Sequence, residues 1–381
     1  MPLPSPFPVF DAHVDSLQRE LDLGHDLGTR TGGHLDLVRG REGGLGAVVL
    51  VSWCDPKFIA PEQGGAYSRT VRLLERFHRL IERHPDQISF VGNAHDFERA
   101  RSAGRIAGIP GIEGGHSIEG SLEKLDWFFE RGIRVMTLVW NNHLDWIRSC
   151  QDGAGADVPA GLSDFGRDVV RTMNRLGMVV DVSHAGVQSF HDVLETSSQP
   201  VIASHSGCYT LNDHPRNLSD DQLRELRDAN GVVGMVFCTP FLDAEARAEE
   251  SRLRATAEYR SIEGPTEADT FFAQGEFLMQ HAKPLHADRL LDHLCHAAEV
   301  AGVEHVGIGS DFDGIERRPV GLEDASCYGT IAAGMRARGF QEHEVRAVMG
   351  GNMERVFRQV TGPGTRAHDA TLTPLHLETV R

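Results

Sequence analysis

Eight short runs of apolar, largely β-branched residues recur along the chain and dominate its hydrophobic pattern. They cover residues 6–10, 45–53, 106–112, 133–140, 178–183, 201–204, 232–237 and 305–309. Such near-continuous hydrophobicity is typical of parallel strands whose faces are both covered by other structure. The pattern therefore predicts a mostly parallel sheet that is covered by helices.

Amphipathic helical patterns separate most of these runs. In residues 71–83, apolar side chains occur at positions 71, 73, 74, 77, 80 and 81, which is the spacing of one helix face. Similar patterns occupy residues 122–130, 165–176, 222–228 and 290–300. Eight alternations of strand and helix predict an α/β fold of the (β/α)8 TIM-barrel type, and an open, doubly wound sheet is the alternative.

We interpret residues 1–381 as a single barrel domain, since a chain of this length can bury one large core. Residues 243–283 are polar and rich in Ala, Glu and Arg, and they predict a helical insertion after the seventh run. This insertion would act as a lid or a packing arm. Residues 363–381 are predicted to form an irregular tail.

Composition and charge argue against some classes of function. The net charge is −17, which argues against binding to nucleic acid or to an anionic membrane, because both need concentrated Lys and Arg. No apolar run reaches the roughly 18 residues of a membrane span, and the N-terminus lacks the features of a signal peptide. The six cysteines are scattered without a CxxC pair, so we expect free thiols and a cytoplasmic location.

Metal-ligand residues gather where the predicted strands end. The first run is followed by His13 and Asp15, which project from the same side because strand side chains alternate. Later runs end in Glu113, His184, His205 and Asp311. Each histidine alone is more often a simple hydrogen-bonding group, and Asp311 with Asp313 could merely shape a loop. Because the carboxyl ends of barrel strands form one face, their recurrence points to a metal enzyme.

Three histidines and several carboxylates at one face can hold two divalent ions about 3.5–4 Å apart if a carboxylate bridges them. Glu113 is the natural bridge, since no lysine ends a strand to serve instead. His13 and Asp15 would then hold one ion, and His184 and His205 would hold the other. Zinc suits this set of ligands best, with manganese and cobalt left open.

Longer motifs carry a resemblance to a known family over about residues 10–360. The motifs are DAHVDSL, GIEGGHSIEG, GLSDFGRDVVRTMNRLGMVVDVSH, PVIASHSGCYTLNDHPRN, VGIGSDFDG and GLEDAS. The chain resembles the membrane (renal) dipeptidase family, peptidase family M19 of the amidohydrolase superfamily. The resemblance implies two Zn²⁺ ions per chain, held by His13, Asp15, Glu113, His184 and His205. It further implies that Asp311 handles the proton of a bridging hydroxide and that Arg216 binds the substrate carboxylate.

The sequence departs from the family pattern in one place near the site. Mammalian members have a histidine that helps to polarise the scissile carbonyl, and Trp140 occupies that position here. His143 or an asparagine amide such as that of Asn141 is predicted to contact the substrate instead. The secretion signal, the lipid-anchor tail and the disulfide pairing of the family have no counterpart, which indicates a soluble microbial-type member.

The resulting prediction is a zinc-dependent dipeptidase in which a metal-bridging hydroxide attacks the peptide bond and a C-terminal D-residue is tolerated. One alternative is another amidohydrolase activity on a lactam, a lactone or an N-acyl amino acid. Arg216 distinguishes the dipeptidase prediction from this alternative, because a neutral substrate has no use for its charge. The other alternative is a non-catalytic metal-binding protein. The expected partner is a small dipeptide, without nucleic acid or membrane, and the family implies a homodimer.

Overall fold

The computed structural model describes residues 5 and 7–364, and the strands in this part of the chain form one parallel sheet. The strands are β1 (Val9–Val14), β2 (Leu45–Trp53), β3 (Ile88–Phe90), β4 (Ile106–Glu113), β5 (Val135–Thr137), β6 (Val179–Asp181), β7 (Ile202–Ser206), β8 (Val232–Met235) and β9 (Val306–Ile308). All eight apolar runs of the sequence contribute a strand. The first strand continues to Val14, beyond the predicted end at residue 10.

The sheet closes into a barrel because β1 pairs with both β2 and β9, while β2 pairs with β4. β3 lies outside this ring of eight strands. It pairs with the first half of β4, and β5 pairs with the second half. The predicted TIM-type barrel is therefore confirmed, with one extra strand. The pattern missed β3 because three residues are too few to show a periodicity.

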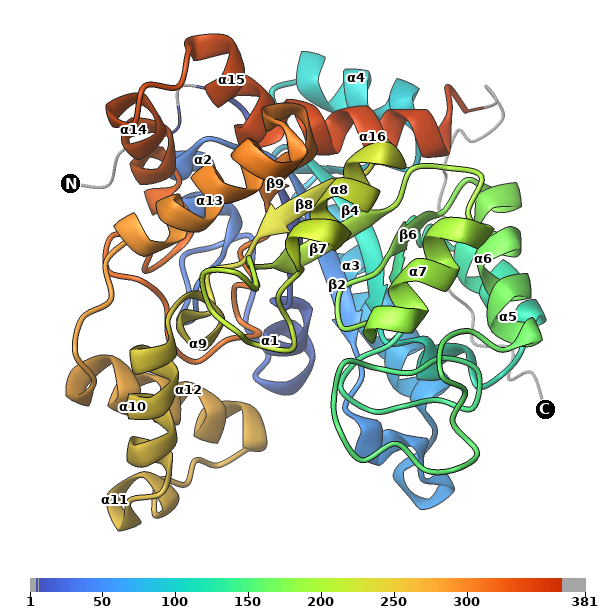
Figure 1. The fold of residues 1–381 in the computed structure, drawn as a ribbon, viewed down its shortest axis with the longest axis horizontal. Coiled ribbons are helices and arrows are strands. Elements are labelled where there is room, and N and C mark those ends of the chain that lie inside the picture. Colours follow the sequence, from blue (N-terminus) through green and yellow to red (C-terminus); the bar gives the residue numbers. More distant parts are fainter. Residues whose placement is uncertain (1–4, 6, 365–381) are drawn as a thin grey trace.

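Helices surround the ring, as Figure 1 shows. They are α1 (Leu17–Asp22), α2 (Leu37–Gly43), α3 (Ala66–Arg83), α4 (Ala94–Ser102), α5 (Leu122–Glu130), α6 (Asp164–Leu176), α7 (Val187–Thr196), α8 (Asp220–Asp228), α9 (Thr239–Leu242), α10 (Ala244–Arg254), α11 (Ala257–Arg260), α12 (Glu267–His281), α13 (Asp288–Ala301), α14 (Gly329–Ala337), α15 (Glu342–Arg346) and α16 (Asn352–Thr361). The five predicted helical patterns coincide with α3, α5, α6, α8 and α13. None of the described helices is long and apolar enough to cross a membrane.

Alternation along the strands divides the core into two parts. Val48 and Leu50 of β2 belong to a cluster that the surrounding helices cover, whereas Val49 and Val51 belong to a second cluster. The second cluster draws residues from most strands of the ring and continues into α16. Because α16 contacts the first residues of β1 and β9, it covers the amino-terminal end of the barrel (Figure 1). The carboxyl ends of the strands are left for a site.

The predicted helical insertion follows β8 and contains α10, α11 and α12. Asp243 caps α10, and Thr266 forms a capping box at the start of α12, which explains where these helices begin. Figure 1 shows this arm projecting from the barrel beside the carboxyl ends of the strands. Arg254 of α10 pairs with Glu316 at 2.8 Å, which ties the arm to the loop after β9. Of the predicted irregular tail, residues 365–381 lie outside the described residues.

Candidate metal centre

The predicted ligands converge at the carboxyl end of the barrel. His13 lies in β1, Glu113 ends β4, and His205 lies in β7. Asp15 comes directly after β1, and His184 follows β6 by three residues. All five side chains are buried. The barrel therefore brings together residues that are up to 192 positions apart in the sequence.

The backbone is strained at this end of the barrel. Among the described residues, five that are not glycine have a positive φ, and His184 (69°), Asp311 (62°) and Asp313 (66°) are three of them. Such conformations are costly for residues with a Cβ atom and persist where the surroundings enforce them. Their concentration at the strand ends supports a functional role for this region.

Glu113 faces two groups of ligands with its two carboxylate oxygens. We call His13, Asp15 and Glu113 Oε2 the first half-site, in which His13 Nε2 lies 3.4 Å from Glu113 Oε2 and 3.7 Å from Asp15 Oδ2. We call His184, His205 and Glu113 Oε1 the second half-site. Its two Nε2 atoms lie 3.0 Å and 3.6 Å from Glu113 Oε1. Each half-site thus offers three ligand atoms close enough together to contact one cation.

The hydrogen bonding of both half-sites fits bound cations. His13 Nε2 and both carboxylate oxygens of Asp15 are buried without a hydrogen-bond partner. Buried polar atoms are normally paired, so these three need a partner that the protein does not supply. In the second half-site the Nε2 atoms of His184 and His205 face each other at 3.1 Å. A divalent ion at each half-site would meet these needs, and imidazole with carboxylate is a usual donor set for such ions.

Charge differs strongly between the two half-sites. Burial by itself would lower the pKa of His13, but the charge of Glu113, assisted by Asp15 and Asp311, raises it to about 10. Burial, and next to it the charge of Glu113, raise the pKa of Asp15 well above its ordinary value. Burial would also raise the pKa of Glu113, yet His13 and then His184 hold it well below its usual range. The first half-site therefore crowds carboxyl groups together, and a bound cation would relieve the repulsion between them.

The second half-site is built from neutral imidazoles. Burial, reinforced by the charge of Arg216, lowers the pKa of His184 to about 4. Burial, followed by the charges of His13 and Arg216, lowers the pKa of His205 well below its ordinary value. Neutral imidazole is the form that binds a metal. These two side chains are therefore ready to act as ligands at neutral pH.

Asp311 lies beside the first half-site, where the sequence predicts a proton acceptor. Its backbone N–H donates to the carbonyl of His13 at 3.0 Å. A Cβ atom on Gly314 would lie 2.3 Å from Asp15 Oδ2 and 2.5 Å from Asp311 Oδ1, so both carboxylates need this glycine. Burial, although opposed by the charge of His13, raises the pKa of Asp311 to about 7. A carboxyl with such a pKa can exchange protons near neutral pH.

Asp313 holds the loop that carries Asp311. Its carboxylate accepts hydrogen bonds from Arg19 Nη1 at 2.7 Å and from the backbone N–H of His34 at 2.6 Å. Burial acts to raise the pKa of Asp313, but Arg19 and then His34 lower it. Asp313 therefore acts as a structural anion beneath Asp311, in keeping with the loop-shaping role that the sequence allowed.

Arg216 is a buried cation without a carboxylate partner. Its side chain is 3% exposed, and none of the ion pairs among the described residues includes it. One guanidinium nitrogen, Nη2, donates to the carbonyl of His205 at 3.1 Å, and Nε has no partner. The ring of Phe241 lies 5.4 Å from the guanidinium carbon. A buried unpaired charge is costly, so this arrangement suits an arriving anion.

The loop after β5 places the other predicted substrate contacts. Asn141 Oδ1 lies 2.9 Å from His184 Nδ1 and accepts from Gln151, which leaves only its NH₂ group for a substrate. His143 uses both ring nitrogens within the loop, where they contact Ser149 and the carbonyl of Asp152. Its role as a substrate contact stays a prediction. Trp140 packs against Trp53, with ring centroids 5.2 Å apart.

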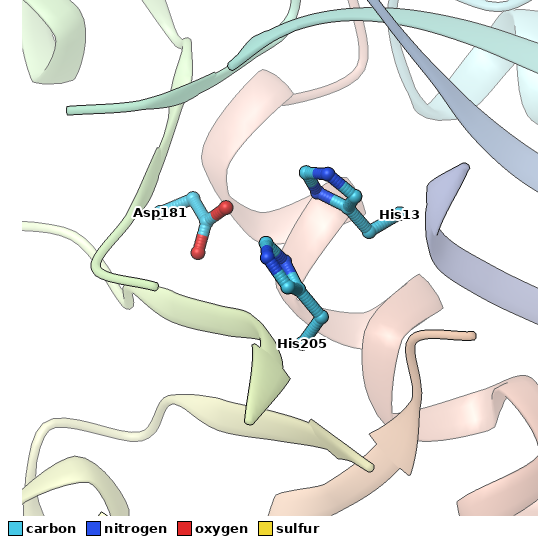
Figure 2. A group of neighbouring side chains, drawn as sticks. All are labelled: His13, Asp181 and His205. Atoms are coloured by element: carbon cyan, nitrogen blue, oxygen red, sulfur yellow. The ribbon is translucent and has the colours of Figure 1, made fainter. Parts of the chain in front are cut away.

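Asp181 and Ser204 lie in the family motifs, but their sequence alone predicts no role for them in the site. Figure 2 shows the carboxylate of Asp181 directed toward the rings of His205 and His13. Ser204 Oγ lies 2.6 Å from Asp181 Oδ2 and contacts both rings. A repeated local pattern could have revealed Asp181. In Asp11-Ala12-His13, as in Asp181-Val182-Ser183, the carboxylate accepts from the backbone N–H two residues later.

Comparisons with known proteins agree with this geometry. A family model described as membrane dipeptidase (peptidase family M19) matches residues 2–369. The structure of the dipeptidase AC, a metallopeptidase of family M19, gives a TM-score of 0.77 at 25% identity, covering 93% of this chain and 99% of that chain. A metallopeptidase from Rhodobacter sphaeroides, liganded with a phosphinate mimic of the dipeptide L-Ala-D-Ala, gives 0.76 at 25% identity with the same coverages. The probable dipeptidase PvdM from Pseudomonas aeruginosa has the same fold, with a TM-score of 0.80 at 22% identity over 94% and 96% of the two chains.

Proposed function

The chain belongs to the membrane dipeptidase family, peptidase family M19, and is a metal-dependent dipeptidase; from this premise we propose that two zinc ions occupy the first and second half-sites. The observation that carries the proposal is the position of Glu113. Its two oxygens face separate ligand groups, with His13 Nε2 at 3.4 Å from one and His184 Nε2 at 3.0 Å from the other. A bridging carboxylate is what a pair of closely spaced cations requires. Nitrogen and carboxylate oxygen ligands favour zinc.

The proposed reaction is hydrolysis of the peptide bond of a free dipeptide. When bound, two such ions polarise the scissile carbonyl and lower the pKa of a water molecule so that hydroxide exists near neutral pH. Asp311 accepts the proton of the attacking water and passes it to the leaving amine nitrogen as the C–N bond breaks. Its position beside Asp15 and its pKa of about 7 support both halves of this proton transfer.

Arg216 binds the terminal carboxylate of the dipeptide in this proposal. A guanidinium can hold a carboxylate with two parallel hydrogen bonds, and such bonds are strong in a buried site. Because Arg216 contacts the carbonyl of His205, it places that carboxylate beside the second half-site. We extend the proposal to dipeptides with a C-terminal D-residue, as in L-Ala-D-Ala, whose phosphinate mimic is bound by the similar Rhodobacter sphaeroides metallopeptidase.

The test is turnover by metal-free protein before and after zinc is restored. The substrates are L-Ala-L-Ala, L-Ala-D-Ala and N-acetyl-L-alanine, together with a lactam and a lactone. We expect hydrolysis of both dipeptides only after zinc is added, and little turnover of the other three compounds. Faster hydrolysis of the acyl amino acid, the lactam or the lactone than of either dipeptide would replace this proposal with a broader amidohydrolase activity. No turnover of any substrate by zinc-loaded protein would favour a metal-binding protein without catalysis.

Two further expectations stand as proposals beside the reaction. We propose a homodimer, which light scattering of the purified protein would test, and a mass of one 41.9 kDa chain would contradict it. We also propose a cytoplasmic location, because the cysteines are scattered and all six lie unpaired in the structure. Fractionation of the source cells would test this location.

A further inference from the structure

We propose that Ser204, held by Asp181, is a positioning residue that orients one histidine of each half-site with a single hydroxyl group. Ser204 Oγ lies 2.8 Å from His205 Nδ1 and 3.1 Å from His13 Nδ1. It also lies 2.6 Å from Asp181 Oδ2. His205 belongs to the second half-site and His13 to the first, so one oxygen contacts both.

Counting hydrogens sets the direction of these three hydrogen bonds. A fourth contact of Ser204 Oγ, with Ser183 Oγ, is the longest at 3.3 Å. A serine hydroxyl has one proton to donate and two lone pairs to accept with, whereas a carboxylate only accepts. The proton of Ser204 therefore goes to Asp181, in a short charge-assisted hydrogen bond. The lone pairs of Ser204 then accept from Nδ1–H of His13 and from Nδ1–H of His205. Both rings are thereby fixed in the tautomer whose Nε2 lone pair points toward a half-site.

Asp181 is a fixed support rather than a metal ligand, although its position beside the two rings would allow either role (Figure 2). Its Oδ1 accepts from the backbone N–H groups of Ser183 at 3.0 Å and Ser204 at 2.8 Å. Its Oδ2 accepts from the hydroxyls of Thr137 at 2.5 Å and Ser204 at 2.6 Å. Four donors saturate this fully buried carboxylate and leave no lone pair directed at an ion.

The remaining histidine has a separate partner. His184 Nδ1 lies 2.9 Å from Asn141 Oδ1, which is an acceptor and so fixes the ring of His184 alone. Loss of Asn141 should therefore affect only the second half-site. Loss of Ser204 should affect both, because it leaves an unpaired Nδ1–H on one ligand of each ion. Partners that orient ligating histidines usually contribute about 10- to 100-fold to metal affinity.

This inference rests on the proposed pair of ions, and metal affinity tests it without relying on activity. Metal-free wild type, Ser204→Ala, Asn141→Ala and Ser206→Ala are titrated with zinc against a competing chelator, and the cobalt absorption spectrum reports ligand geometry. Ser206 is the matched control, since it lies on the same strand, is buried, and has a hydroxyl without a partner. We expect Ser204→Ala to weaken both ions by about 10- to 100-fold and to change the cobalt spectrum. Asn141→Ala should weaken one ion, and Ser206→Ala should leave both within about threefold.

The outcomes separate this inference from the proposed function. Wild type that binds fewer than two ions overturns the proposed function. Two outcomes overturn this inference alone when wild type binds two ions. In one, Ser204→Ala binds both ions within about threefold of wild type. In the other, Ser204→Ala loses affinity for only one ion. If Ser204→Ala does not fold, Asp181→Asn serves as the second variant. Its amide replaces one carboxylate oxygen with an NH₂ donor, which then faces either the two hydroxyls or the two backbone N–H groups. Wild-type affinity for both ions in Asp181→Asn would also overturn the inference.

Discussion

The two half-sites share Glu113 but differ in their other ligands and in their charge. The first combines one histidine with Asp15 and lies beside Asp311, whereas the second contains two histidines and lies beside Arg216. Negative charge raises the pKa of His13 to about 10, although burial opposes it, while burial and then Arg216 lower the pKa of His184 to about 4. The centre is therefore electrically polar, with the buried carboxyl of Asp311 on one side and the buried guanidinium of Arg216 on the other.

In the proposed reaction, this polarity gives a dipeptide a single productive orientation. The terminal carboxylate is attracted to Arg216, beside the second half-site. The amine that leaves must then receive its proton from Asp311, beside the first. Both groups are buried, so their interactions with the substrate are screened only weakly by solvent. The proposed reaction thus places proton transfer and carboxylate binding on opposite sides, so we expect variants on each side to change kcat and kcat/KM differently.

The largest effect is expected on the first side, from Asp311→Asn. The amide cannot accept a proton from water, so kcat should fall by about 10²- to 10⁴-fold. The two ions should stay bound, because Asp311 is not one of the ligands that face Glu113. Steady-state kinetics together with elemental analysis of the variant would test this. A kcat within about threefold of wild type would show that another group moves the proton.

A smaller effect is expected on the second side, from Arg216→Ala. Removing one partner of a buried charge pair should cost about 2–4 kcal/mol in kcat/KM for free dipeptides. Replacing the dipeptide carboxylate with an amide should cost wild type a similar amount and should cost the variant little more. Equal turnover of the free acid and the amide by wild type would remove Arg216 from substrate binding.

The smallest effect concerns the pH dependence of metal binding. With the pKa of His13 raised to about 10, its ring carries a proton in metal-free protein at neutral pH, and an ion must displace it. Affinity at the first half-site should therefore rise with pH, by at least about tenfold per unit near neutral pH, since His13 gives up one proton and the raised pKa of Asp15 acts in the same direction. With the pKa of His184 lowered to about 4, no proton is displaced at the second half-site above pH 6.

Zinc titrations at pH 7, 8 and 9 would resolve two binding steps and show whether only one of them changes with pH. The ligand variants Asp15→Asn and His184→Gln would identify which step belongs to which half-site. Two steps with the same pH dependence would contradict the electrical difference between the half-sites.

Much of this architecture could be predicted from the sequence because it depends on local patterns. Apolar runs locate the eight strands of the ring, and the ends of those strands locate His13, Glu113 and His205. The barrel then brings these strand ends together, independently of the conformations of the loops. The strand Ile88–Phe90 escaped detection because it is short and lies outside the ring.

The partners of the ligands could not be predicted in the same way. Ser204 contacts His13 from 191 positions away, and nothing in either local sequence indicates that contact. The loop after β5 illustrates the same limit, since the sequence suggested Asn141 as a substrate contact but not as the acceptor beside His184. Contacts between side chains of different strands depend on register and rotamer, which hydrophobic patterns do not specify.

The number of tightly held ions per chain tests the central claim most directly. Metal-free protein would be loaded with zinc, freed of weakly bound ions by gel filtration, and measured by elemental analysis against protein concentration. We predict two zinc ions per chain in wild type, and a loss of both tight binding and activity in Glu113→Ala, which removes the bridge. A value of one ion or fewer in active, fully loaded wild type would contradict it.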